Sequence, residues 1–501
     1  MGNKENGKTI KSLEPIAIQG STELVALPST ESESDERIKQ HPVDAVLVEF
    51  LEDIRSIQKT HMVVLPHVLS WLRGQHESNA KKLTKYKSQS EDEAEVYRAT
   101  SAHQTSEMLK AIRELDGLGG MRIPETLQRS LFTQLFSEYD AFVGALLKVI
   151  YKRKTDLLKG ISRQITFADL IAYDDLNAIK LDMLEKEVET FRRDSYVEQF
   201  ATLESKFSLK LRSFDEWGEF VELSQRRNLI VHNGGVVSDQ YLLVCDREGF
   251  KFKERPKLGD VLKPDVQYFS RATVVVSKVA FMLCHTLWRK IFPSEQEAAH
   301  ESANKTLYDL LRDKRWKTAN EIAKFSLTDR MKDGISDIEL RLRTVNAAIA
   351  AKFSGDQVAC NTILQTLDWS AAYRDFRLAI AVLNDDFISA AGMMKTIGRN
   401  GELVVELSYH DWPLFHKFKE SPEFLEAYTA IYGISYLTEA VRHKTEEAQS
   451  SQAEFDRGME TLDVHSKEVK ADVAMETPVK KVSRPKRVRV AVSKTEANPT
   501  T

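Results

Sequence analysis

Three polar residues near the end of one predicted helix carry side chains suited to acid–base and phosphate chemistry. They are Arg227, Asn228 and His232, within the stretch SFDEWGEFVELSQRRNLIVHNGG. An imidazole titrates near neutral pH and can serve as a general base or a general acid. A guanidinium offers a planar fork of donors that matches phosphate oxygens and stabilises charge that develops at phosphorus. Asn228, one turn before His232, is placed either to fix the imidazole or to contact the phosphate.

The helix that carries these residues is amphipathic. Ser213 and Glu216 form the sequence pattern of a capping box at its start, and the Gly-Gly pair after the last turn predicts its end. At about 100° per residue, one side contains Asp215, Glu219, Glu222 and Arg226, and the other contains Trp217, Phe220, Val221, Leu223 and Val231. Arg227 and Asn228 lie inside the apolar arc, where an unpaired guanidinium is costly. They therefore have partners in a core network, or they face a groove or a subunit interface.

Arg227 and His232 form an Arg-x4-His pattern with a polar residue directly after the arginine. This pattern resembles the signature of the HEPN superfamily, helical-bundle domains of which many are metal-independent RNA endonucleases. The similarity to bacterial HEPN-type domains covers residues 120–293, through an apolar first helix, ITFADLIAYDDL, DSYVEQFATLESKF and RRNLIVHNGGVV. A second Arg-x4-His pattern, Arg98 to His103, lies in the polar stretch RATSAH, without a glycine stop or an apolar stripe.

The resemblance implies cleavage of single-stranded RNA without a metal ion or another cofactor. RNA supplies its own nucleophile, the 2′-hydroxyl, once a base removes its proton and a cation holds the phosphate. The implied products are a 2′,3′-cyclic phosphate and a 5′-hydroxyl, with Arg227, Asn228 and His232 as the catalytic residues. Arg227 and His232 lie about 140° apart on an ideal helix, so one chain offers a single acid–base group. HEPN ribonucleases bring two motifs together, and the resemblance therefore implies a homodimer through the motif helix.

The same resemblance implies a bacterial protein of phage defence or of a toxin–antitoxin pair, whose C-terminal repeats bind a protein partner or an antitoxin. A purely structural interpretation stays open beside it. Arg227 can pair with Glu138 or Asp140 of the first domain helix, and His232 can cap the motif helix. The protein is then a non-catalytic helical scaffold, in which the HEPN-like domain dimerises and the repeats bind protein partners.

The composition favours a soluble, all-α protein. The 501 residues are 42% hydrophobic and include only 13 Pro and 21 Gly, and the mean hydropathy is −0.37. The formal net charge of −4 is small for this length, so binding of nucleic acid requires a local site. Three distant cysteines fit neither a disulfide framework nor a zinc cluster, and they favour a reducing, cytoplasmic setting. No apolar run approaches the ~20 residues that a membrane span needs.

The chain divides by composition into five parts. We expect a disordered tail over residues 1–40, a helical extension over 41–119, the HEPN-like domain over 120–293, helical hairpins similar to tetratricopeptide repeats over 302–433, and a disordered tail over 446–501. The extension should begin with two helices, the first over residues 42–54 and the second over 63–72. In the HEPN-like domain, residues 236–244 and 249–261 carry β-branched residues between turn residues, which predicts short extended segments. The last tail contains KKVSRPKRVRV, a basic cluster that fits solubility, attraction to nucleic acid or nuclear import.

Overall fold

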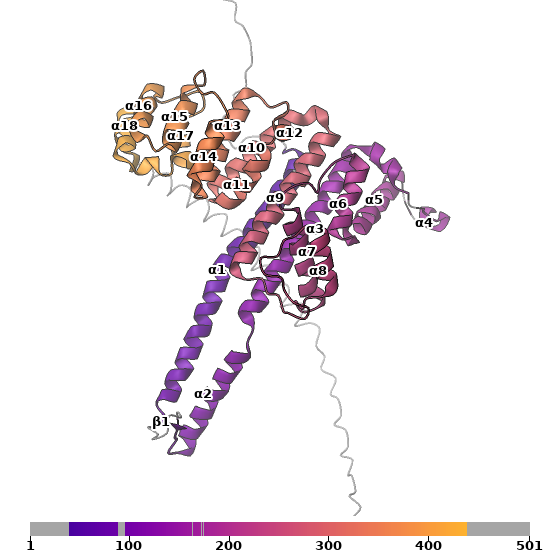
Figure 1. The fold of residues 1–501 in the computed structure, drawn as a ribbon, viewed down its shortest axis with the longest axis vertical. Coiled ribbons are helices and arrows are strands. Elements are labelled where there is room, and N and C mark those ends of the chain that lie inside the picture. The colour runs from indigo at the N-terminus through magenta and orange to yellow at the C-terminus, as the bar shows by residue number, and fades with distance from the viewer. Residues whose placement is uncertain (1–39, 89–95, 163, 172, 174, 438–501) are drawn as a thin grey trace, which may run out of the picture. The chain divides into compact units, whose positions relative to one another are not determined.

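The computed structural model describes residues 40–88, 96–162, 164–171, 173 and 175–437 (Figure 1). The tails predicted over 1–40 and 446–501 lie outside this part of the chain, apart from residue 40. Helices provide nearly all of the regular structure, so the prediction of an all-α fold is confirmed. The strands in the described ranges are one short antiparallel pair, β1 (Lys87–Ser88) and β2 (Val96–Tyr97). No described helix combines the length and the apolar character needed to cross a membrane.

The longest helix, α1 (Pro42–Thr84), is continuous where the sequence predicted two helices. That prediction is wrong because the buried stripe of the first helix continues past residue 54 through Ile57, His61 and Leu65. Pro66 lies inside the helix and removes one backbone donor, yet it does not end it. The apolar stripe therefore outweighs the one unfavourable residue.

Helices α1, α3, α7 and α9 surround one aromatic core (Figure 1). The elements from residue 102 to 291 are α2 (Ala102–Gly120), α3 (Ile123–Arg153), η1 (Thr155–Gly160), α4 (Phe167–Ile171), α5 (Leu176–Arg193), α6 (Tyr196–Phe207), α7 (Trp217–His232), α8 (Asp239–Arg247) and α9 (Val266–Ile291). Phe50 of α1 and Phe220 of α7 both meet the ring of Tyr139 of α3 edge to face, and all three are buried. The first part of α1 thus shares a core with the helices after residue 120, while α2 pairs with its second part (Figure 1).

Residues 236–261 contain a helix where the sequence predicted two extended segments. Helix α8 begins after Ser238, whose hydroxyl oxygen accepts from the Tyr241 N–H at 3.3 Å. Tyr241 and Cys245 are four residues apart and both are buried, as on one face of a helix. The prediction is wrong for residues 236–244, because this cap and the helical spacing override the β-branched residues. Residues 249–261 form an irregular loop, in which Val261 makes an isolated antiparallel bridge with Val236.

The loop between α8 and α9 is fixed at both ends by backbone hydrogen bonds. At its start the Phe250 N–H donates to the Cys245 carbonyl at 2.9 Å, and at its end the Leu262 N–H donates to the Gly235 carbonyl at 2.9 Å. Gly235 has a φ of 87°, and a Cβ there would lie 2.7 Å from the Leu262 carbonyl oxygen. Both the backbone conformation and the available space therefore require glycine at this position.

Short helices follow α9, and successive ones pack as pairs, such as α13 with α14 and α15 with α16. They are η2 (Pro293–Glu295), α10 (Gln296–Arg312), α11 (Trp316–Ser326), α12 (Asp329–Lys332), α13 (Asp337–Phe353), α14 (Gln357–Leu364), α15 (Arg374–Leu383), α16 (Phe387–Ile397), α17 (Glu406–Asp411), η3 (Pro413–Phe415), η4 (Phe418–Glu420) and α18 (Pro422–Tyr432). Ala390 and Ala391 of α16 are buried, as expected where small residues let helices approach closely. A separate compact unit begins at Leu425, within α18.

Basic side chains are buried together between α9, α10 and α13. Arg343 is fully buried, and its Nε donates to Asn304 Oδ1 at 2.7 Å. Burial, and then the charges of Arg289 and Arg343, lower the pKa of His300 to about 4. Burial, and then the charges of the same two arginines, lower the pKa of His285 to about 3. Both imidazoles are therefore neutral in the folded protein at pH 7.

We expect the fold to lose stability as the pH falls below 6.5 towards 4, because unfolding lets both imidazoles take up a proton. In this window each imidazole removes about 1.4 kcal/mol of unfolding free energy per pH unit. His285→Phe removes one of the two, and the new ring is flanked by Phe281 and Trp288, whose centroids lie 4.3 and 6.0 Å from the imidazole. The free energy of unfolding of the variant, minus that of the parent chain, should rise by about 1 kcal/mol when the pH is lowered from 7 to 5.5. Urea unfolding at both pH values measures this gain, and a difference that does not change with pH would contradict it.

Candidate functional site

Helix α7 begins without a side-chain cap and ends at a glycine stop. Glu216 occupies the N-cap position, but the capping box predicted with Ser213 is wrong, because the Glu216 carboxylate accepts from Lys278 Nζ at 2.7 Å instead. At the other end, the backbone N–H groups of Asn233 and Gly235 donate to the Leu229 carbonyl at 2.8 and 2.9 Å. The glycine stop is therefore confirmed, and it leaves the histidine of the motif in the last turn of the helix.

Two residues of α7 lie on the opposite side from the one that the sequence pattern assigned to them. Trp217 and Phe220 are buried as predicted. Val231, predicted in the core, is 46% exposed, and Glu222, predicted on the charged surface, is only 1% exposed. Helical periodicity failed here because it cannot show that α8 and α9 cover the Glu222 side of the helix. The last turn, in contrast, is left partly uncovered.

The buried carboxylate of Glu222 is satisfied by three side chains. Its Oε1 accepts from Arg226 Nε at 2.8 Å and from the Tyr241 hydroxyl at 2.6 Å, and its Oε2 accepts from the Tyr268 hydroxyl at 2.8 Å. The guanidinium of Arg226 also stacks on Tyr268, 4.0 Å from the ring centroid. Burial and the Glu222 charge raise the pKa of both phenols well above its ordinary value, so both remain donors. This network joins α7 to α8 and α9 and fixes the rotation of α7 about its axis.

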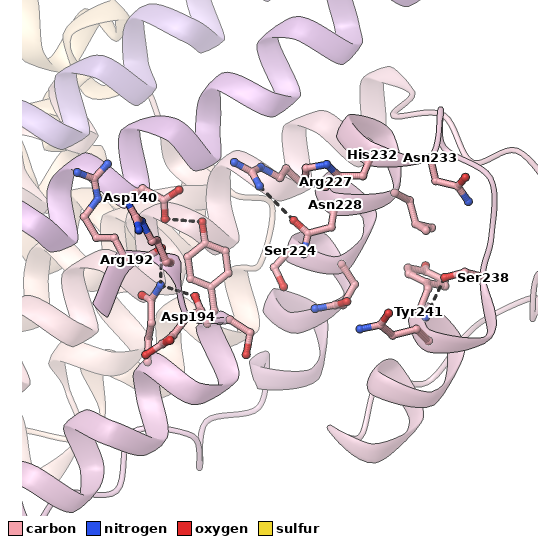
Figure 2. A pocket seen from close by; sticks show the side chains of 17 residues that line it. Asp140, Arg192, Asp194, Ser224, Arg227, Asn228, His232, Asn233, Ser238 and Tyr241 are labelled. Carbon is pink, nitrogen blue, oxygen red and sulfur yellow. Dashed lines mark hydrogen bonds between the residues drawn. The ribbon is translucent and has the colours of Figure 1, made fainter. Parts of the chain in front are cut away.

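The three residues predicted as a site line one groove with a volume of about 640 Å³. Figure 2 shows Arg227, Asn228 and His232 on one side of it, with Asp140 and Arg192 on the other. The groove extends to the start of α8, where Ser238 at the N-cap position and Gln240 and Tyr241 of the helix line it. Asn228 and His232 are exposed and Arg227 is half-buried, so all three are open to a ligand.

The polar groups of the motif make few contacts with the rest of the chain. Arg227 Nη1 donates to Asn228 Oδ1 at 3.1 Å, and the buried Nε of Arg227 has no hydrogen-bond partner among the described residues. The sequence suggested that Asn228 fixes the imidazole or contacts the phosphate. In the structure its amide oxygen orients the Arg227 guanidinium instead. The His232 ring forms no hydrogen bond within the described ranges, so it does not cap the helix.

Asp140 of α3 is the carboxylate that faces Arg227 across the groove (Figure 2). Its Oδ1 accepts from the Tyr196 hydroxyl at 2.7 Å. Burial raises the pKa of Asp140, whereas the bond from Tyr196 and the charges of Arg227 and Arg192 oppose this rise. In the described structure Arg227 forms an ion pair with neither Asp140 nor Glu138, the two partners that the structural interpretation named.

Sequence reasoning missed the part of the groove that the corner between α5 and α6 contributes. Arg192, Asp194 and Ser195 line the groove from this corner. The one signal they leave in the sequence is Ser195-x-x-Glu198, a capping box that predicts a helix start and says nothing of a ligand. The residues of α8 were missed because that segment was predicted to be extended.

Comparison of the chain with protein-family models, with curated proteins and with solved structures found no match. Across the described residues, no three or more His, Cys, Asp or Glu side chains are grouped in a way that could hold a metal ion.

We expect Glu222→Gln to lower the free energy of unfolding by about 3–5 kcal/mol, because it leaves the charge of Arg226 buried without a counter-ion. The new amide NH₂ also meets hydroxyl donors that need an acceptor. Urea unfolding at pH 7 measures the loss. Glu219→Gln is the matched control. Glu219 lies one turn earlier and pairs with Arg271 nearer the surface, and the side chains of Glu219 and Arg271 are 27% and 41% exposed. The control should lose less than about 1 kcal/mol, and equal losses in the two variants would refute the special role of Glu222.

Proposed function

We propose that the protein is a metal-independent RNA endonuclease of the HEPN type that acts on single-stranded RNA. The observation that carries the proposal is the shared groove of about 640 Å³, which Arg227, Asn228 and His232 line together. In the described structure neither the guanidinium nor the imidazole of this motif is engaged by a carboxylate. A groove that combines an available cation with an exposed acid–base group suits a phosphodiester.

The reaction is a transesterification within the RNA chain. The neutral imidazole of His232 takes the proton of the 2′-hydroxyl, the 2′-oxygen bonds to phosphorus, and the bond from phosphorus to the 5′-oxygen breaks. The leaving oxygen takes a proton from an acid, and the products are a 2′,3′-cyclic phosphate and a 5′-hydroxyl. Arg227 donates to the non-bridging oxygens and stabilises the charge that builds there. Asn228 positions this guanidinium through its Oδ1, 3.1 Å from Nη1.

A second copy of the chain supplies the second acid–base group. One chain places one imidazole in the groove, whereas the reaction uses a base for the 2′-hydroxyl and an acid for the leaving oxygen. Val231, next to the motif histidine, is apolar and 46% exposed, and a dimer through α7 would cover it. We therefore infer a homodimer through α7. The helices after α9 then bind a protein partner or an antitoxin, in phage defence or in a toxin–antitoxin pair.

The purified full chain should cleave a fluorescently labelled single-stranded RNA in the presence of EDTA and leave cyclic phosphate ends. His232→Ala should lower the rate by at least about 100-fold, the scale of lost general acid–base catalysis. Its melting temperature should not change, because the ring is exposed and forms no hydrogen bond in the described structure. Gel electrophoresis and calorimetry measure the two quantities.

The second Arg-x4-His pattern provides the matched control. His103 lies on α2 with an 84% exposed side chain, outside the groove, so His103→Ala should cleave at the parental rate. Cleavage that requires added Mg²⁺, or equal losses in the two histidine variants, would reject the proposed chemistry. A parent chain that dimerises without cleaving or binding RNA would favour the non-catalytic scaffold.

A further inference from the structure

Arg192 brings a second guanidinium to the groove, from a helix other than the motif helix. It is the penultimate residue of α5, it is exposed, and it lines the groove from the side opposite the motif (Figure 2). Its guanidinium forms no ion pair or hydrogen bond with a described residue. The neighbouring Arg193 differs, since its Nη2 lies 2.5 Å from Glu189 Oε1. Arg226 differs as well, because it is bound by Glu222 at 2.7 Å.

Arg192 and Arg227 lie close enough to act on the same carboxylate. The positive charges of both oppose the rise that burial causes in the pKa of Asp140. Salt screens such interactions between exposed charges over about 8–10 Å at ordinary ionic strength. The two guanidiniums therefore flank Asp140, one from α5 and one from α7, and they form two positive points on either side of one groove.

The groove is larger than one phosphate group requires. Its volume of about 640 Å³ is many times the share of a single water molecule, which is about 30 Å³. An RNA strand that places its scissile phosphate on Arg227 must carry the adjoining phosphate along the groove. Proteins hold single strands through such rows of cations along the backbone.

We propose that Arg192 binds the phosphate adjacent to the scissile one and so sets the path of the RNA across the groove. This inference rests on the proposed function of the same site. Arg192 is then a substrate-binding residue that takes no part in proton transfer. Its guanidinium can donate to two phosphate oxygens at once. Such a contact orients the phosphate as well as attracting its charge.

The test measures binding of a 2′-O-methyl single-stranded RNA, which cannot be cleaved, to the full chain by fluorescence anisotropy at several salt concentrations. Arg192→Gln should raise Kd about fivefold to tenfold at low salt, as for loss of one phosphate contact. It should also make the plot of log Kd against log salt shallower by about 0.7, the contribution of one contact with a single strand. With cleavable RNA, the loss should fall mainly on KM. The basic cluster in KKVSRPKRVRV contributes equally to both proteins, so it cancels in the difference between slopes.

Arg247→Gln is the control, because Arg247 is an exposed arginine of α8 that pairs with Glu248 and lies outside the groove lining. Its slope should equal that of the parent. If Arg192→Gln also keeps the parental slope while the parent chain cleaves RNA, the second phosphate contact is refuted and the proposed function stands. If the parent chain neither binds nor cleaves RNA, both are refuted.

Discussion

The orientation of α7, and with it the direction of Arg227, Asn228 and His232, depends on one buried negative charge. Glu222 is almost inaccessible to solvent, and a carboxylate in such a place must be paired. Its partners come from three helices, namely Arg226 on α7, Tyr241 on α8 and Tyr268 on α9. Any rotation of α7 would break these bonds, so the helix has one permitted orientation. The motif on the last turn and a half of α7 faces the groove as a result.

Two adjacent arginines of this helix have different environments for the same reason. Arg226 is held by the buried carboxylate and stacks on Tyr268. Arg227, about 100° further round the helix, faces Asp140 without forming an ion pair, and its Nη1 is held by Asn228. One guanidinium therefore stabilises the fold, while its neighbour keeps its charge available to a ligand. This division leaves one charge in the groove while the adjacent one is paired inside the fold.

Local sequence patterns were sufficient for the all-α class and for part of the site, although they divided α1 and missed α8. The apolar stripe predicted the buried face of α7 through Trp217 and Phe220, and the glycine pair predicted its end, because both depend on residues close in sequence. The motif residues do share one groove. The burial of Glu222 could not be predicted, because it depends on Tyr241 and Tyr268, which lie 19 and 46 residues away in sequence. The same limitation hid Arg192, since only the folded chain brings the end of α5 opposite α7.

The connection between α8 and α9 has a consequence for how the chain tolerates changes in length. Backbone hydrogen bonds from Phe250 and Leu262 hold its two ends, and most residues from 251 to 260 are exposed. Doubling the length of such a loop costs only about 0.6 kcal/mol in closure entropy. Phe252 packs against Tyr241, and residues 259 and 260 bond to the Val237 backbone, so insertions between residues 253 and 257 leave the groove in place. The segment is accordingly a natural place to attach an epitope or a fluorophore to this protein.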